Sequence, residues 1–368
     1  MIKQKFTILG PSGVGKTSLM ATMYDNVKEM FNGTLLSIKP SSNSNQRINR
    51  AVAEMNAALS PDAEFEPREG TSEAIEYSFS IGMSSNYFIE CAFKDFPGGW
   101  LSDDIDRFEK EILPWLMESQ VLILPVDASQ LMQYNKKDKK QRESVINFCE
   151  IPQLERIVGD WAKERRAKNT FGRIFVVPLR CETYINDYNK SQLMYQQINE
   201  IYKPVFDSFV KNIGEQHDAY YCPVDTYGCV KFLKCKWEKN AIGGLTFRPT
   251  FVCDSIENPK RIPKGADEIF AYMLGVFIGA QINETGKEFV TLVNENQWSL
   301  FFADCLPDFL KTNNLKELQT KRDKLKDELI SLGLNEISSL GIEGKNFISE
   351  LSSMIEKKGL SRLKKLEI

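Results

Sequence analysis

Apolar runs alternate with amphipathic stretches along the first three-quarters of the chain. Runs rich in β-branched and aromatic residues predict six strands, at 5–9, 74–81, 87–93, 120–126, 173–179 and 220–224. Residues with a helical period predict helices at 18–30, 46–59, 145–168, 191–213 and 267–282. The second and third strands are separated only by 82–86, so they must pair antiparallel. We therefore predict a three-layer α/β fold with a mostly parallel six-stranded sheet and one antiparallel edge strand.

The remaining sequence suggests an insertion and a C-terminal region. Residues 229–263 lack helical periodicity and include the strand-like stretch 245–253, which predicts an inserted hairpin. After residue 283 the composition changes, and 284–368 is expected to be a mostly helical region beside a main domain of 1–283. Within it, helices are predicted at 343–358 and 360–366, and heptad positions are occupied by Leu315, Leu318, Leu325, Leu329 and Leu332. This region either packs back on the main domain or offers a surface for a partner or for self-association.

The most specific motif lies directly after the first predicted strand. Residues 10–17 read G-P-S-G-V-G-K-T, which matches G-x-x-x-x-G-K-[ST] without a mismatch and precedes a predicted helix. Glycines let the loop backbone curl around phosphate oxygens, and the helix N-terminus adds partial positive charge. Lys16 is expected to reach the β- and γ-phosphates, and Thr17 to hold Mg²⁺. The predicted nucleotide-binding residues are Gly10, Pro11, Ser12, Gly13, Val14, Gly15, Lys16, Thr17 and Ser18.

Composition narrows the function classes. The 368 residues include 47 Lys and Arg against 50 Asp and Glu, a net charge of −3, so a strongly basic nucleic-acid binder is excluded. The N-terminus has no signal-type pattern and no run of apolar residues is long enough to span a membrane, which favours a cytoplasmic protein. The eight cysteines have no C-x-x-C spacing and are expected to be reduced thiols; a zinc site from Cys222, Cys229 and Cys235 is the alternative.

A carboxylate ends the third predicted strand. The sequence there is Lys94-Asp95-Phe96-Pro97-Gly98. Asp95 is therefore expected at the carboxyl end of its strand, beside the glycine-rich loop at 10–15, which is called the phosphate loop below. Such a carboxylate can bind Mg²⁺ directly or through water. Gly98, without a Cβ, can bring its backbone N–H close to a γ-phosphate. The alternative is an ordinary strand-ending turn, in which Asp, Pro and Gly are common.

With these residues the chain resembles the Ras-like P-loop GTPase superfamily, whose second and third strands form such a hairpin. The family's D-x-x-G matches Asp95 to Gly98, and its Mg²⁺-contacting switch threonine corresponds to Thr71. The resemblance covers about three-quarters of the chain and implies a P-loop fold that binds GTP or GDP with Mg²⁺ through Thr17, Thr71 and Asp95. P-loop ATPases fit less well, because no predicted strand here ends in Asp-Glu.

The base-reading motifs depart from the family pattern. The family's N-K-x-D falls on Leu179-Arg180-Cys181-Glu182, so its carboxylate is kept as Glu182 while its asparagine is missing. Glu182 is expected to accept hydrogen bonds from guanine N1 and N2, Arg180 to stack on the base, and Asp225 to supplement base reading. The family's S-A-[KL] loop is absent. Guanine is therefore the expected base, with adenine or relaxed specificity as the alternative.

The resemblance also implies a switch. Segments 37–74 and 94–107 correspond to the family's two switch regions, which a γ-phosphate orders and which signal to a protein partner. The family's water-orienting glutamine is replaced by Gly99, so slow hydrolysis is expected. Arg68 has the spacing from Thr71 that the internal arginine finger has in heterotrimeric G-protein α subunits, and Arg107 or a partner's residue is the alternative. A nucleotide-binding scaffold without turnover is the other interpretation.

Overall fold

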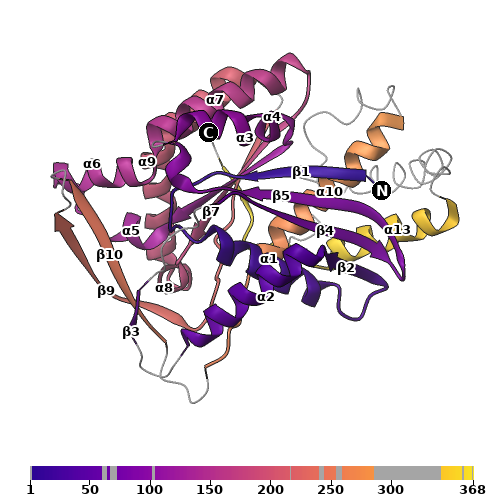
Figure 1. Ribbon diagram of the computed structural model, residues 1–368, viewed down its shortest axis with the longest axis horizontal. Coiled ribbons are helices and arrows are strands. Elements are labelled where there is room, and N and C mark those ends of the chain that lie inside the picture. The colour runs from indigo at the N-terminus through magenta and orange to yellow at the C-terminus, as the bar shows by residue number, and fades with distance from the viewer. Residues whose placement is uncertain are drawn as a thin grey trace, which may run out of the picture.

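The computed structural model describes residues 2–59, 64–66, 73–101, 104–215, 217–239, 244–253, 259–285, 341–358, 360–366 and 368 (Figure 1). The strands are β1 (Ile2–Ile8), β2 (Leu36–Pro40), β3 (Glu64–Phe65), β4 (Ile75–Met83), β5 (Asn86–Asp95), β6 (Val121–Asp127), β7 (Gly172–Leu179), β8 (His217–Tyr221), β9 (Val230–Lys239), β10 (Leu245–Cys253) and β11 (Lys364–Lys365). The helices are α1 (Lys16–Met30), α2 (Ser42–Ala57), η1 (Gly98–Leu101), α3 (Ile105–Glu111), α4 (Leu113–Glu118), α5 (Ala128–Gln133), α6 (Lys139–Phe148), α7 (Ile151–Ala167), α8 (Glu182–Ile185), α9 (Tyr188–Ile213), α10 (Ala266–Thr285) and α13 (Gly341–Lys358).

The main sheet is mixed, with the order β11-β8-β7-β6-β1-β5-β4-β2. Strands β5, β1, β6, β7 and β8 are parallel, whereas β4, β2 and β11 each pair antiparallel with their inner neighbour. All six predicted strands are present, but the sheet has eight strands rather than six. The prediction missed β2 because its run Leu36–Pro40 is short and leads into a polar segment. It missed β11 because this strand consists of only two lysines, which give no apolar or β-forming pattern.

Helices cover both faces of this sheet (Figure 1). On one face, α1, α2, α10 and α13 enclose a core with strand residues such as Phe6, Phe79 and Phe93. On the other face, α3 to α7 and α9 enclose a second core with strand residues such as Leu124 and Val176. Strand residues buried on both faces read as continuous apolar runs, which is why the central strands could be recognised in the sequence.

Two predicted helices differ from the structure. The amphipathic stretch 145–168 is divided into α6 and α7 at Glu150, whose φ is +52°. Pro152 follows in the first turn of α7, where its missing N–H costs no hydrogen bond within the helix. Residues 360–366, predicted as a helix, contain β11 instead. There Leu366 donates its backbone N–H to the carbonyl of Ala219, so main-chain pairing with β8 outweighs local helix propensity.

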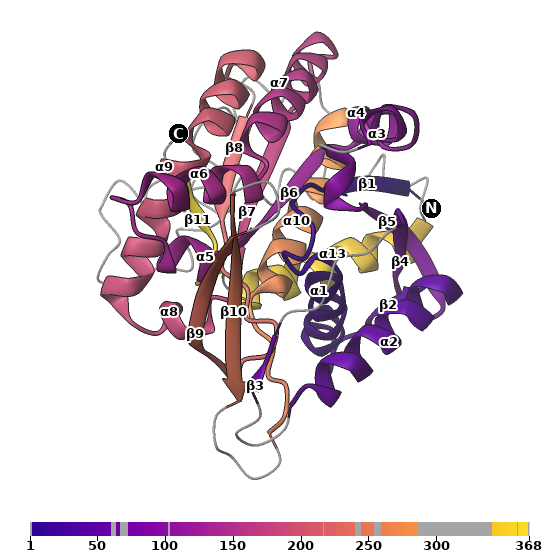
Figure 2. The ribbon, with the colours of Figure 1, turned by 60° about the vertical axis from the view of Figure 1, so that its left-hand side comes forward.

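The predicted inserted hairpin is formed by β9 and β10, and β3 joins it as a third strand in the order β3-β10-β9 (Figure 2). β9 contacts α8, and β10 contacts α5 and α6. Aromatic pairs stabilise this small sheet, including Phe65 with Phe251 at a ring-centroid distance of 6.0 Å. The hairpin thereby stands beside the carboxyl ends of the main strands, next to the loop that follows β1.

The C-terminal helix α13 lies against α10, β2 and β4. Phe347 stacks on Phe88 of β5 with ring centroids 4.7 Å apart, and Leu351 is fully buried. The division into 1–283 and 284–368 stays a prediction, and the heptad leucines at 315–332 lie outside the described residues. Among the helices that the structure describes, none combines the length and the apolar character that crossing a membrane requires.

Candidate functional site

The loop 10–15 joins the carboxyl end of β1 to the first turn of α1. Gly15 caps α1 with φ +107°, a left-handed conformation that glycine adopts without strain. The first N–H groups of a helix have no partner within the helix and carry partial positive charge. Residues 13–18 line a cavity at this helix end, while Gly10, Pro11 and Ser12 lie in the same loop outside the cavity wall. The geometry is that of an anion-binding helix N-terminus.

Lys16 is held inside this loop. Its Nζ donates to the carbonyl oxygens of Gly10 at 2.9 Å and Pro11 at 3.0 Å. Burial lowers the pKa of Lys16, while the negative charges of Asp95 and Glu150 oppose that shift. An ammonium group so desolvated gains from an anion placed beside it, because a buried charge without a counter-charge is costly.

Asp95, the last residue of β5, lies beside Thr17 in the first turn of α1. Asp95 lies opposite Ile8 in the parallel β1–β5 register, and Thr17 Oγ1 donates to Asp95 Oδ2 at 3.4 Å. The other oxygen, Oδ1, is buried with no hydrogen-bond partner. Burial raises the pKa of Asp95 to about 6, although Lys16 and the hydrogen bonds from Thr17 and Phe96 act against this.

These two oxygen donors fit a Mg²⁺ ion of the kind found in nucleotide sites. Mg²⁺ is usually held there by one or two protein oxygens, and phosphates and water complete its octahedron. Hence a dedicated cage of side chains is not required. The described part of the chain contains no group of three or more His, Cys, Asp or Glu residues that could hold a metal. The alternative zinc site from Cys222, Cys229 and Cys235 is therefore not formed among the described residues.

Gly98 lies directly against the phosphate loop. A Cβ built on Gly98 would fall 2.0 Å from the backbone N of Ser12 and 2.4 Å from the carbonyl carbon of Pro11. Only glycine permits this approach, because both obstructing atoms belong to the backbone. The following Gly99 has no side chain, and Trp100 is buried. Arg107 lies over the Trp100 ring at 4.1 Å from its centroid.

Arg180 contacts the phosphate loop rather than an open base site. Its guanidinium donates to the carbonyl oxygen of Gly13 and forms an ion pair with Asp127, which caps α5. Arg180 has φ +56°, a left-handed conformation that directs its side chain back over the ends of β6 and β7. It lines the cavity, but both of these contacts use guanidinium donors. The predicted stacking on the base would use the remaining planar face.

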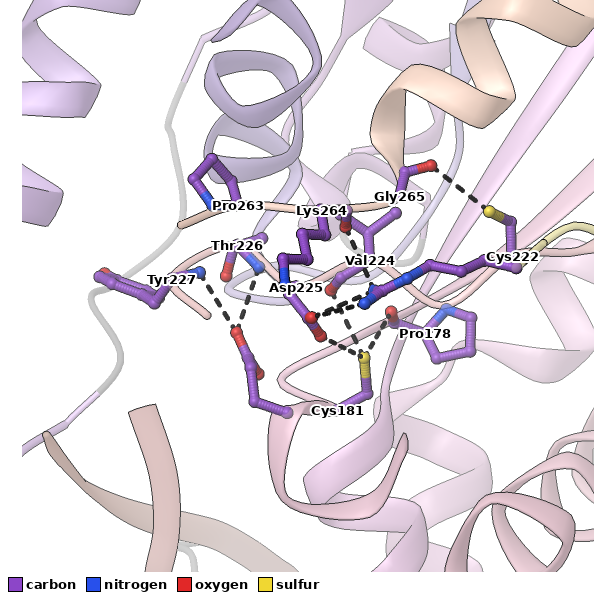
Figure 3. Close-up of polar contacts among 12 residues, drawn as sticks. Pro178, Cys181, Cys222, Val224, Asp225, Thr226, Tyr227, Pro263, Lys264 and Gly265 are labelled. Carbon is purple, nitrogen blue, oxygen red and sulfur yellow. Dashed lines mark hydrogen bonds and ion pairs between the residues drawn. The ribbon is translucent and has the colours of Figure 1, made fainter. Parts of the chain in front are cut away.

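Glu182 lines the same cavity and is held by the backbone that follows β8. Its Oε1 accepts hydrogen bonds from the N–H groups of Thr226 at 3.1 Å and Tyr227 at 3.3 Å (Figure 3). Burial raises the pKa of Glu182 to about 7, the charge of Asp225 adds to the effect, and backbone hydrogen bonds oppose it. Both of these hydrogen bonds are accepted by the same carboxylate oxygen, Oε1.

Asp225 does not line the cavity, contrary to the predicted role in base reading. Its carboxylate Oδ2 accepts from both terminal nitrogens of Arg362, each at 3.1 Å. Its main chain pairs with Lys264 in both directions at 3.0 Å (Figure 3). The side chain therefore lies behind the loop 225–227, where a partner 137 residues further along the sequence holds it. No sequence pattern signalled that partner.

One cavity of about 410 Å³ connects these features. It begins at the phosphate loop and Asp95 and extends to Arg180 and Glu182. Its remaining walls come from α2, β3, the end of β7, the loop after β8 and the hairpin. The residues are Ala51, Glu54, Met55, Ala58, Phe65, Glu66, Leu179, Thr226, Tyr227, Val230 and Phe251. The volume is typical of small-ligand sites, and the walls combine apolar surface with a few polar groups.

Sequence reasoning missed most of these wall residues. Ala51 and Met55 lie on the buried face of α2. The helical spacing of such apolar residues was the one sequence signal that α2 packs against another part of the protein. Phe65, Tyr227 and Phe251 come from three separate segments and meet only in the folded chain. Two predicted catalytic residues, Arg68 and Thr71, lie outside the described residues. The structure brings together the predicted residues at 13–18, Asp95, Arg180 and Glu182.

Comparisons with known proteins gave limited similarity. No family model matches the chain. No curated protein matches it. Two solved structures of the GTPase-like domain of Ski7 from S. cerevisiae, one bound to GDP and inorganic phosphate and one bound to GTP, are similar at 11% identity and a TM-score of 0.31. The similarity covers 60% of this chain and 43% of each of those chains. So distant a likeness carries no argument about function.

Proposed function

We propose that the protein binds a nucleoside triphosphate with Mg²⁺ and prefers guanine as the base. The observation that carries this proposal is the single cavity that runs from the phosphate loop to Glu182. At one end it presents a helix N-terminus and a buried lysine, and at the other a carboxylate among aromatic walls. A nucleotide has the same polarity, with a polyanion at one end and a flat base with hydrogen-bond donors at the other.

At the phosphate end, the loop N–H groups and Lys16 bind the phosphate oxygens. Lys16 is already positioned by the carbonyls of Gly10 and Pro11, so little side-chain entropy is lost when the phosphates arrive. Thr17 and Asp95 hold Mg²⁺, which supplies positive charge to the phosphates, and the unpartnered Oδ1 of Asp95 gains a ligand.

At the base end, Glu182 in its ionised form accepts hydrogen bonds from guanine N1 and N2. Adenine offers no such pair of donors, and a carboxylate left facing it loses hydrogen bonds in a buried site. Arg180 holds the phosphate loop to the end of β6 through Gly13 and Asp127, so it links the two ends of the site.

Slow hydrolysis and a switch role extend this proposal. Gly98 lies close enough to the phosphate loop for its N–H to sense a γ-phosphate, and the proposed second switch, 94–107, includes it. The first part of the proposed first switch, 37–74, forms β2 and α2. The part of this switch that would respond to a γ-phosphate is therefore the segment after α2. A protein partner would bind these segments or the C-terminal helices. Thr71 and Arg68 keep their proposed roles at the metal and the transferring phosphate.

A nucleotide-binding scaffold without turnover is the second candidate, favoured by the surroundings of Gly99. Arg107 is occupied by the Trp100 ring and by Glu111, to which its Nε donates at 2.9 Å. Trp100 is buried and Gly99 cannot orient water. Within the part of the chain that the structure describes, no side chain is seen in the place of the family's catalytic glutamine.

Identification of the nucleotide that co-purifies with the protein tests the binding proposal. We expect GDP or GTP to be released when the purified protein is denatured and its supernatant is separated by chromatography. Single-turnover phosphate release from Mg²⁺–GTP then separates the two candidates. Slow release by the wild type that falls further in Arg68→Ala supports the hydrolysing switch, whereas no release from either supports the scaffold.

A further inference from the structure

The end of the chain returns to the base end of the proposed nucleotide site. After α13, the segment 360–366 crosses the start of α10, where Glu268 accepts hydrogen bonds from the backbone N–H of Arg362 at 2.8 Å and of Leu363 at 3.0 Å. Ser361 Oγ adds a hydrogen bond to the other Glu268 oxygen at 3.2 Å. β11 then pairs with β8, and Leu366 is buried.

The backbone so anchored aims the Arg362 side chain at Asp225. Both terminal guanidinium nitrogens lie 3.1 Å from Asp225 Oδ2, and the Arg362 Cδ lies 3.2 Å from where a Cβ on Gly265 would stand. Asp225 is only 6% exposed, and the side chain of Arg362 is 23% exposed. Hydrogen-bonded ion pairs of this kind, half removed from water, fix geometry more firmly than surface pairs do.

Asp225 in turn fixes the loop that holds Glu182. The next two residues, Thr226 and Tyr227, are the ones whose N–H groups donate to Glu182 Oε1 (Figure 3). Behind the loop, Lys264 pairs with the main chain of Asp225, and Arg261 Nε donates to the Thr226 carbonyl at 3.3 Å. A shift of Asp225 would therefore move both donors that orient the Glu182 carboxylate.

We propose that Arg362 is a positioning residue for nucleotide recognition: through Asp225 and the loop 225–227 it holds Glu182 in the orientation that reads the base. This inference rests on the proposed function, because it assigns a residue that controls the selectivity of the same site. It explains why Arg362, which does not line the cavity, pairs with a buried carboxylate 137 residues earlier in the chain. The C-terminal segment thereby becomes part of the specificity of the site and not only of its stability.

The test compares GTP with inosine triphosphate, which lacks the 2-amino group that Glu182 would bind. Calorimetric affinities for both nucleotides in Mg²⁺ give a GTP/ITP preference for the wild type. In Arg362→Ala we expect this preference to fall about tenfold, the cost of one misaligned charge-assisted hydrogen bond. The affinity for inosine triphosphate, which keeps the N1–H that Glu182 also accepts, should fall by a smaller factor than the affinity for GTP. Arg362→Lys keeps a charged donor for Asp225 and should restore most of the preference.

Lys358→Ala is the matched control. It removes another ion pair of the C-terminal segment, Lys358 Nζ to Asp267 Oδ2 at 2.6 Å, which does not contact the loop 225–227. A merely structural role of the segment predicts equal losses for both nucleotides in Arg362→Ala, and a similar loss in Lys358→Ala. Our inference predicts an unchanged preference in Lys358→Ala.

The outcomes separate this inference from the proposed function. If Glu182→Gln lowers the GTP/ITP preference and Arg362→Ala does not, the inference is wrong and the nucleotide site stands. If the wild type binds neither nucleotide, the proposed function fails and the inference with it. Should Arg362→Ala fail to fold, Asp225→Asn decides in its place, because it weakens the same ion pair from the other side and must lower the preference in the same way.

Discussion

At the scale of single residues, the site is built from charged groups that the fold has removed from water. Lys16 and Asp95 are each almost fully buried. Burial lowers the pKa of Lys16 and raises the pKa of Asp95, so it favours the neutral form of both groups. Such residues cost folding free energy, and proteins retain them chiefly where a ligand uses them. The unpartnered Oδ1 of Asp95 is the plainest sign of that arrangement.

Under the proposed function, Asp95 should make the Mg²⁺ dependence of nucleotide binding sensitive to pH. Its pKa is raised to about 6, so the carboxylate is ionised above that pH and protonated below it. Protons compete with the metal, and we expect the gain in GTP affinity from Mg²⁺ to fall up to about tenfold per pH unit below the pKa. Titrations of GTP in Mg²⁺ and in EDTA across this range measure the gain. Asp95→Asn should abolish both the gain and its pH dependence; equal wild-type affinities with and without Mg²⁺ would contradict the metal assignment.

Glu182 should make base preference sensitive to pH as well. Its pKa is raised to about 7, and only the ionised form accepts both guanine donors, so preference for GTP over ATP should be largest above this value and decline below it. Affinities of both nucleotides on either side of neutrality report the ratio. Protonation of Asp95 weakens both nucleotides equally and cancels from that ratio. Glu182→Gln should lower the ratio at least about tenfold at high pH; an unchanged ratio would remove Glu182 from base reading.

At the scale of secondary-structure elements, the cavity wall depends on the hairpin that covers the strand ends. Phe251 of β10 is buried among Phe65, Phe232 and the cysteine pair Cys229 and Cys253, and its ring lines the cavity. β3 reaches this wall from a segment more than 160 residues earlier and pairs with β10. The hairpin therefore supplies one wall of the cavity at the strand ends.

Removal of one ring tests this contribution of the hairpin. We expect Phe251→Ala to weaken binding of GTP and ATP alike by about tenfold, the scale of one lost aromatic contact, because it opens the wall without touching the phosphate loop. Phe247→Ala on the same strand is the control: Phe247 packs on Trp237 at 5.1 Å and does not line the cavity. Fluorescence titrations and thermal melts of both variants supply the comparison. Equal affinities in the two variants would show that the hairpin stabilises the fold only.

Element by element, the sequence revealed what has a local signal. Strands β6, β7 and β8 were recognised because almost all of their residues are buried, which gives continuous apolar runs. β4 is buried mainly at alternating positions and was recognised from its β-forming residues, and the phosphate loop was recognised because its glycines and lysine follow a strand. β2 and β11 have no such signal, since their place depends on open sheet edges. The pairing of Asp225 with Arg362 joins residues far apart in the chain, so no local pattern predicted that Asp225 would be held outside the cavity wall.

At the scale of the whole molecule, the sheet brings all parts of the site to one edge. β1, β5, β6 and β7 are parallel, and their carboxyl ends deliver the phosphate loop, Asp95, Asp127 and the Arg180–Glu182 turn to neighbouring positions. The C-terminal segment closes the far side by pairing with β8. A nucleotide bound at this edge would contact residues from many of these elements in the folded protein only. Its binding should therefore raise the melting temperature of the entire fold.

The most direct measurement is a calorimetric titration of Mg²⁺–GTP into nucleotide-free protein, with Lys16→Ala alongside. We predict saturable binding by the wild type with Kd in the micromolar range or tighter. The affinity should fall at least about a hundredfold in Lys16→Ala, because this variant lacks the buried ammonium group that would balance the charge of the phosphates. Thermal melts should show that Lys16→Ala remains folded. A wild type that gives no binding heat with GTP, GDP or ATP, and a Lys16→Ala variant that behaves identically, would contradict the nucleotide site itself.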